Sequence, residues 1–313
     1  MGIARANIIV GPARIVRGAG TVYTKDSFEV RLNHATFDVV VDALGKVDER
    51  SEDATAALQF TPEGRWDAAT RAFLWPYLNP TIGMDVFGAA DTPTLIHDSN
   101  AHLHTIPASA VTQMPNLKLS PVDTMVGACT ITGIRANNGD WDDADSLYTA
   151  ASAGGVINDA GFTPPLIKTQ VYTGAWAGSA GFGTIKAQAG WDVEFETQIS
   201  FIKVDEIGTV KGILTRVGVM ARCMPVAGPT SAQIVAALKM QDAGGARGRS
   251  LNATGADLVI TGADAATVVT VKKAGLKTAG FRFGLTTIRE GELAWVATRD
   301  VTAGVPQALC TLA

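Results

Sequence analysis

The chain of 313 residues is poor in the features that mark several large protein classes. It has three cysteines, Cys129, Cys223 and Cys310, and this odd number in apolar surroundings predicts buried free thiols rather than a disulfide framework. No apolar run approaches the roughly 18 residues needed to cross a bilayer, and the first residues lack a signal-peptide pattern, so we expect no membrane anchor. The net charge of −4 argues against a dedicated nucleic-acid binder, which needs a basic surface.

Catalytic signatures are also lacking. Neither a Gly-x-Ser-x-Gly elbow nor a phosphate-binding loop occurs in the sequence. Glu194 and Glu196 form an acidic pair, but the repeat described below has Arg31 and Asn33 at the matching positions. We therefore predict that the protein is not an enzyme and uses no cofactor.

Three of the four histidines lie in the stretch 97–104. His102 and His104 are two residues apart, so on a strand they share one face, and with His97 or Asp98 they are a candidate metal site. We favour the alternative of surface or interface histidines, because the second copy of the repeat has no histidine in this region.

Two further stretches have a weaker resemblance to binding loops. The acidic run 140–145 lacks the glycine and glutamate of a calcium loop, which favours a solvated acidic turn. The run 244–249 is rich in glycine and arginine but follows a predicted helix rather than preceding one, which favours a basic loop over an anion site.

What is present is the composition of an ordinary globular protein, with 47% apolar and 18% charged residues. The clearest feature is a stretch that occurs twice, at residues 20–62 and 183–225. Asp42 and Asp205 lie 163 residues apart, and the same offset relates Gly45 to Gly208. No gap is needed across the 43 positions, of which eight are identical, and the alternation of apolar and polar residues is preserved. We interpret this as a tandem duplication.

The alternation predicts a long half-buried strand from residue 28, a turn at residues 44–46 and an antiparallel partner strand. An irregularity is expected near residues 34–35. A short helix is predicted over residues 66–74 after the first copy, and another over residues 231–241 after the second, with Ser231 as its N-cap.

Two similar domains in tandem follow from this pattern, at residues 1–150 and 166–313, with a linker at residues 151–165 that is rich in glycine, alanine and proline. Each domain is predicted to be mainly β, a β-sandwich or open barrel with one flanking helix. Beyond the helices the alignment needs gaps, and it sets residues 127–131 against 284–288 and Trp141 against Trp295.

The order of strand, long hairpin, helix and further strands resembles that of the major tail tube proteins of tailed bacteriophages. The resemblance lies in residues 7–17 with their Gly11-Pro12 break, in the hairpin centred on residues 42–47, and in the helix that follows. It implies β-sandwich subunits whose inner sheets join into rings, with the rings stacked into a tube through which DNA passes during ejection. Six single-domain subunits commonly form such a ring. Two domains per chain therefore imply a pseudo-hexameric ring of three chains, with six chains as the alternative if only one domain lines the lumen.

The resemblance also implies partners and a location. The chain would assemble with itself in the host cytoplasm and reside in the virion tail, with other tail proteins at the tube ends and DNA passing without specific binding. The candidate lumen-facing residues are Glu29, Arg31, Asp192, Glu194 and Glu196. An acidic lining repels DNA phosphates, although Arg31 departs from it. Candidate ring-to-ring contacts are Ser51, Glu52 and Asp53, expected in an exposed part of the hairpin, and the irregular loop at residues 79–100.

Two other classes of function stay open at this point. A carbohydrate-binding or adhesive β-sandwich protein would use exposed tryptophans as stacking platforms. The six candidates are Trp66, Trp75, Trp141, Trp176, Trp191 and Trp295. Their apolar surroundings favour core packing instead. A hydrolase would use paired carboxylates or the histidines of residues 97–104.

Overall fold

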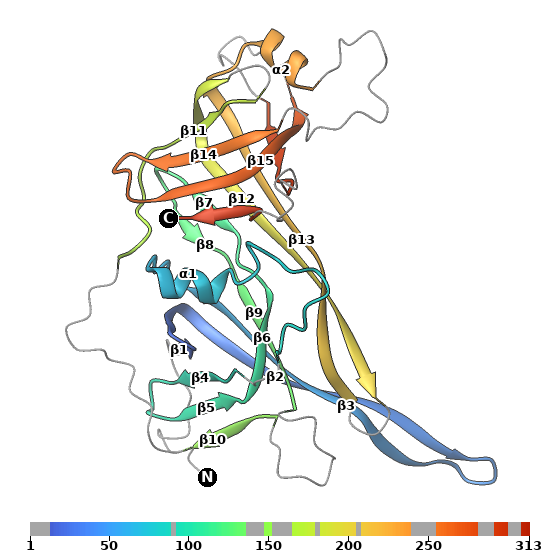
Figure 1. Ribbon diagram of the computed structural model, residues 1–313. Coiled ribbons are helices and arrows are strands. Elements are labelled where there is room, and N and C mark those ends of the chain that lie inside the picture. The colour runs from blue at the N-terminus through green and yellow to red at the C-terminus, as the bar shows by residue number, and fades with distance from the viewer. Residues whose placement is uncertain are drawn as a thin grey trace.

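The computed structural model describes residues 13–88, 92–135, 147–151, 165–178, 182–204, 208–238, 255–280, 291–299 and 308–313. The described chain is mainly β and forms two antiparallel sheets, one of eight strands and one of nine, with two short helices (Figure 1). The predicted fold class is confirmed.

The first sheet has the strand order β10-β5-β4-β1-β2-β3-β9-β6. Its strands are β1 (Arg14–Arg17), β2 (Gly20–Val41), β3 (Gly45–Pro62), β4 (Thr94–His97), β5 (Leu103–Ile106), β6 (Ala108–Gln113), β9 (Cys129–Ile134) and β10 (Thr149–Ala151). Only Pro107 separates β5 from β6, and these two halves of one bent strand pair with β4 and β9 respectively. The bent strand therefore closes six strand positions into a barrel, which we call the first barrel.

The second sheet has the order β11-β14-β15-β16-β13-β12-β7-β8, with β17 paired to β15. Its strands are β7 (Leu117–Leu119), β8 (Met125–Val126), β11 (Tyr172–Trp176), β12 (Gly183–Val204), β13 (Gly208–Ala227), β14 (Ala256–Gly262), β15 (Val268–Ala279), β16 (Leu293–Val296) and β17 (Cys310–Leu312). Because β11 pairs with β12 as well as with β14, six of these strands also close on themselves. We call β11 to β16 the second barrel.

The two barrels repeat each other in order and in register. The hairpin β2–β3 and the hairpin β12–β13, called the first and second hairpins below, match at the offset of 163 residues. Phe28 opposes Phe60 in one, and Trp191 opposes Cys223 in the other. The β-bulge after Ala35 recurs after Gln198, and the bulge after Val39 recurs after Ile202. The predicted irregularity near residues 34–35 is confirmed, and the duplicated pattern of sequence corresponds to a duplicated hairpin.

Beyond the hairpins the pairing partners correct the gapped alignment. Residue Leu58 of β3 opposes Ile131, and the matching Ala221 of β13 opposes Trp295. Strand β16 is thus the counterpart of β9, and Trp295 takes the place of Ile131 rather than that of Trp141. The alignment failed because it matched glycine-containing segments by their composition. Residues 284–288 and Trp141 lie outside the described residues.

Each barrel carries one helix directly after its hairpin. Helix α1 (Ala68–Leu74) is capped by Asp67, whose side chain accepts a hydrogen bond from the Thr70 backbone N–H. Helix α2 (Ser231–Ala237) is capped by Thr230, which forms a capping box with Gln233. The predicted N-cap Ser231 was wrong by one residue, because the threonine before it supplies the same hydroxyl and has the glutamine at the required spacing.

The core runs without interruption through both barrels. Its largest fully buried side chains include Trp176, Trp191 and Trp295 of the second barrel, and the rings of Trp191 and Trp295 lie 5.7 Å apart. Trp75 joins the halves, because its ring lies 6.0 Å from that of Phe195, and its Nε1 is held by the Pro115 carbonyl of the first half at 2.7 Å. The two halves are therefore packed against each other through apolar side chains.

One hairpin crosses from the first half into the second sheet. Strands β7 and β8 lie between β6 and β9 in sequence, yet β7 pairs with β12 along Trp191–Val193. Leu117 and Leu119 of β7 are buried at this junction. The residues of the two sequence halves consequently do not divide cleanly between the two sheets.

Candidate assembly surface

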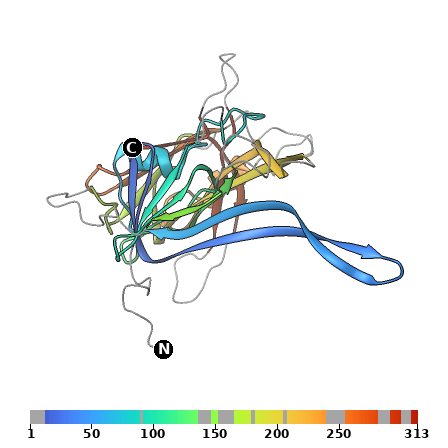
Figure 2. The same ribbon diagram turned by 90° about the horizontal axis from the view of Figure 1, so that it is seen from below.

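Both long hairpins leave the barrels toward the same side of the molecule (Figure 1). Seen from below, the first hairpin extends well beyond the body (Figure 2). The far ends turn at Gly45 and Gly208, which have φ values of 75° and 83°. These positive values suit glycine, which lacks the Cβ that makes this conformation unfavourable for other residues.

The second hairpin is covered by the first half of the chain at three places. The first place is the free edge of β12, where Leu117–Leu119 adds a strand to Trp191–Val193. Asn116 extends this contact, because its Oδ1 accepts a hydrogen bond from the Phe195 backbone N–H at 2.9 Å. A strand edge that otherwise exposes unpaired backbone groups is thereby satisfied.

The second place is the edge of β13 at residues 212–214. Asp85 bridges to Ile213, and the Val86 backbone N–H donates to the Gly212 carbonyl at 2.8 Å. Phe87 is 4% exposed and its ring lies 6.4 Å from that of Phe201. This part of the loop 79–100, a candidate ring-to-ring contact, is used here within the chain.

The third place is the tip of the second hairpin, which packs on Asp53 of β3. The Asp53 carboxylate accepts hydrogen bonds from the Thr209 backbone N–H at 2.9 Å and from the Thr209 hydroxyl at 2.7 Å. The Lys203 ammonium lies 3.0 Å away. Burial by itself raises the pKa of Asp53, but these bonds from Thr209 and Lys203 outweigh it, so the pKa lies below its ordinary value. The carboxylate is therefore held in its charged form.

Asp53 corrects the expectation that residues 51–53 are exposed. Only 6% of Asp53 is exposed, because the second hairpin covers it, whereas Glu52 next to it faces solvent. Ser51 opposes Thr36 across the bulge. A ring-to-ring role for Ser51 and Glu52 stays a prediction, while Asp53 has its partners inside the chain.

The first hairpin has a different surface. Six of its apolar side chains are between 43% and 76% exposed, namely Leu32, Phe37, Val40, Val41, Leu44 and Val47. Charged residues lie among them, and Lys46 pairs with Asp38 and with Glu49. Along Phe28–Val30, the edge that corresponds to the covered part of β12, no described strand pairs with β2.

The candidate lumen-facing residues lie on the solvent sides of the hairpins and are largely paired. Glu29 and Arg31 form an exposed ion pair at 2.7 Å. Glu194 pairs with Arg222 at 3.1 Å, and Glu196 pairs with Arg216 at 3.4 Å. Arginines of β13 thus neutralise the charge of Glu194 and Glu196, two of the three acidic residues in the run 192–196.

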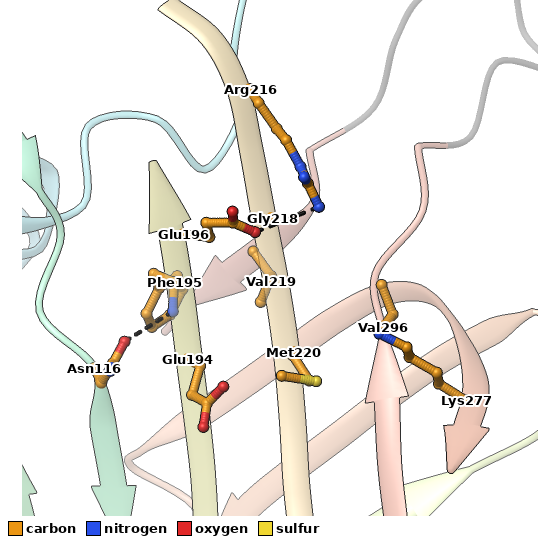
Figure 3. Close-up of a pocket in the computed structure, with 10 residues that line it drawn as sticks. All are labelled: Asn116, Glu194, Phe195, Glu196, Arg216, Gly218, Val219, Met220, Lys277 and Val296. Atoms are coloured by element: carbon orange, nitrogen blue, oxygen red, sulfur yellow. Dashed lines mark hydrogen bonds and ion pairs between the residues drawn. The ribbon is translucent and has the colours of Figure 1, made fainter. Parts of the chain in front are cut away.

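A groove of about 350 Å³ lies beside these pairs on the outside of the second barrel. Glu194 and Glu196 of β12, Arg216 of β13 and Lys277 of β15 are among its lining residues (Figure 3). Its lining includes apolar side chains such as Val219 as well as side chains of both charge signs. Such a surface suits a charged peptide segment better than a small apolar ligand.

The histidines are organised around a buried carboxylate rather than on the surface. Asp98, 1% exposed, lies 2.9 Å from His102 Nδ1 and 3.3 Å from His104 Nε2. His104 is 6% exposed and its Nδ1 lies 2.6 Å from the Tyr148 hydroxyl. The surface interpretation was wrong for His104, because residues just before β10 cover it. Within the described residues no group of His, Cys, Asp and Glu side chains is arranged to hold a metal ion.

The remaining sequence expectations have mixed outcomes. The five described tryptophans are at most 4% exposed, so none of them is a surface stacking platform. The three cysteines are buried and free, as predicted, and burial raises the pKa of each thiol, that of Cys310 to about 12. Neither helix in the described part of the chain is long and apolar enough to span a membrane. The runs 140–145 and 244–249 lie outside the described residues.

Sequence reasoning missed the partners that the second hairpin finds in the first half. Thr209 and Lys203 carry no signal of their own, since each is one of many polar residues in a strand-like pattern. The change from Lys46 to Thr209 at matching tip positions was the one available indication that the two tips have different surroundings. No protein-family model matches the chain, and no curated protein matches it.

Proposed function

We propose that this chain is a structural subunit of a bacteriophage tail tube, which assembles with itself into stacked rings. The observation that carries the proposal is the repetition of one barrel, with the same hairpin register, inside a single chain. Repeated units whose long hairpins leave a strand edge uncovered, as at Phe28–Val30, are suited to closing a ring, because ring closure can satisfy the backbone groups along that edge. Three chains would supply six barrels to each ring.

The chain's part in this function is assembly, with no chemical step. Rings formed in the host cytoplasm would stack into the tube of the virion tail, and other tail proteins would contact its ends. The faces that carry Glu29, Asp192 and Glu196 would line the lumen. Because arginines pair with most of the carboxylates, we expect a lining without a strong net charge of either sign, which lets DNA slide without being bound.

Electron microscopy of the purified protein tests this proposal. We expect rings or tubes about 100 Å across, from the packing of six small domains around a pore. A sedimentation series over a wide range of protein concentrations and salt is the companion measurement. A protein that stays monomeric throughout, with no particle larger than one chain in the micrographs, would overturn the proposal.

A further inference from the structure

Every contact that the first half makes on the second hairpin has a counterpart position on the first hairpin. Strand β7 pairs with Trp191–Val193, and 163 residues earlier lies Phe28–Val30, with no described strand along the same edge. The bridge of Asp85 reaches Ile213, whose counterpart is Arg50. These counterpart positions are exposed or half-buried. Within the described part of the chain, no strand or loop covers them as β7 and Asp85 cover the second hairpin.

We propose that the first hairpin docks on the second barrel of another copy of this chain, in the way that the second hairpin docks on the first barrel within one chain. The proposal rests on the proposed function only for the choice of a second copy as the partner. It specifies a place: the tip of the first hairpin, around Lys46, lies on β13 of the neighbour beside Arg216. These two residues are the counterparts of Thr209 and Asp53, which are in direct contact within the chain.

The docking place within the chain and the proposed one between chains have opposite charges. Each of the two pairs an acidic surface with a basic one. Within the chain, an acid on the barrel strand, Asp53, receives a base from the hairpin, Lys203. On the second barrel the corresponding residue is a base, Arg216, whose side chain is 62% exposed. The first hairpin has a base, Lys46, at the matching position, but Lys46 is paired with both Asp38 and Glu49, so this cluster has a net negative charge. The Arg216 guanidinium has donors left over after its contact with Glu196.

The order of the barrels follows from which docking place is already occupied. The second hairpin of each chain covers Asp53 of its own first barrel, so a first hairpin from another copy cannot dock there. The place beside Arg216 on the second barrel is exposed, so docking there makes first and second barrels alternate around the assembly. The contact joins two different surfaces, head to tail, so successive copies either close into a ring or continue as a filament.

The exposed apolar residues of the first hairpin support the same partner. Phe37, Val40 and Leu44 are 50%, 61% and 76% exposed, on a hairpin that extends beyond the body of the chain (Figure 2). A long strand pair with exposed apolar side chains is prone to unspecific association unless another chain covers it. The groove beside Arg216 has apolar residues in its lining, among them Val219 and Met220 (Figure 3).

Disulfide trapping in the full-length assembled protein tests the proposal. The double variant K46C/R216C places thiols at the counterparts of Thr209 and Asp53, which are in hydrogen-bonding contact within the chain. A disulfide needs Cα atoms roughly 4.4–6.8 Å apart, so it forms only if the two hairpins dock in equivalent ways. We expect oxidation to give a ladder of covalent multimers on a non-reducing gel. The variant D53C/T209C is the matched control, and it should oxidise within one chain and give no ladder. The three native cysteines are buried and contribute little background.

A second pair measures random collisions. Val122 is 86% exposed at the turn between β7 and β8, so K46C/V122C should give multimers only at the collision rate. A ladder for K46C/R216C that is several-fold stronger than this supports the proposal, and an equal or weaker one overturns it. If the double variant does not fold, the charge pair replaces it: R216E should weaken self-association at least tenfold, and adding E49K should restore it. Loss without restoration overturns the proposal.

These outcomes separate the docking proposal from the tube proposal. Rings in the microscope together with no specific disulfide overturn the docking geometry and leave the tube function standing. A specific disulfide ladder without rings or tubes supports the docking geometry and overturns the tube function.

Discussion

The two hairpins of this protein have the same backbone structure but different surroundings. Their strands share pairing register and two β-bulges at a constant offset of 163 residues. The second hairpin is covered by β7, by the Asp85 bridge and by Asp53, whereas the part of the first hairpin between Asp53 and the tip is largely exposed. The difference teaches that the backbone of a duplicated unit is set by its own alternation and turns, while its side chains adapt to what covers it.

The largest expected difference concerns the matching residues Trp191 and Phe28. Trp191 is fully buried with its ring 5.7 Å from that of Trp295, while Phe28 is half-buried. We expect W191A to lower the free energy of unfolding by about 3–5 kcal/mol, because it opens a large cavity. F28A should cost about 1–2 kcal/mol, since less area returns to water. Urea unfolding of both variants measures this, and equal losses would show that the two surroundings are energetically alike.

Asp53 and Arg216 give the next comparison. Replacing Asp53 by alanine leaves the buried Thr209 donors without an acceptor, so we expect a loss of about 2–3 kcal/mol in the free energy of unfolding. R216A should change it by less than about 0.5 kcal/mol, because the pair with Glu196 is exposed. Both values come from denaturant titration at low protein concentration. A costly R216A in the monomer would contradict its assignment to a surface between chains.

The Asp53 carboxylate should also make the stability of the protein depend on pH. Because the pKa of Asp53 is depressed in the folded state, its contribution is complete above the ordinary aspartate pKa of about 3.9 and is lost as the pH falls through the lower folded value. The stability gap between the wild type and D53N should therefore be constant from pH 7 to about 5 and shrink below about 4. Thermal unfolding across this range checks it. A gap that widens in acid would mean that the folded pKa is raised.

The glycines at the hairpin turns give the smallest contrast. Both have positive φ, so an alanine strains either turn by about 1 kcal/mol. A Cβ at Gly45 meets nothing within 4 Å, whereas a Cβ at Gly208 comes 2.7 Å from the Asp53 Oδ1. We expect G208A to cost about 1 kcal/mol more than G45A, because it also displaces the Asp53 carboxylate. Melting curves of the two variants decide this, and equal shifts would show that Asp53 moves aside freely.

The hairpins could be predicted from the sequence because the features that determine them lie within the hairpin segments themselves. Alternation sets the strands, glycine sets the turns at Gly45 and Gly208, and a constant offset relates the copies. The crossing of β7 into the second sheet was not predictable in this way. Leu117 and Leu119 indicate a strand, but a period of two does not say which of two sheets receives it. Trp295 was misplaced for the same reason, since its counterpart is defined by pairing with β13 rather than by residue type.

The candidate site was predictable in position but not in role. Asp53 lies in a charged run that resembles a solvated hairpin, and its partners are more than 150 residues away in sequence. The acidic run of Asp192, Glu194 and Glu196 was predicted to give a negative face. The arginines that balance it, Arg216 and Arg222, lie on the neighbouring strand, where the pairing register sets each of them diagonally across from its glutamate. Charge read along one strand is therefore a poor guide to the charge of a sheet face.

The central claim is that the two barrels occupy equivalent places in one assembly. Native mass spectrometry of isolated rings tests it most directly, because it counts the chains of 32.6 kDa in each ring. Alternation of first and second barrels around a pseudo-hexameric ring predicts three chains. A ring of six chains would place only one barrel of each chain at the lumen and would contradict the claim.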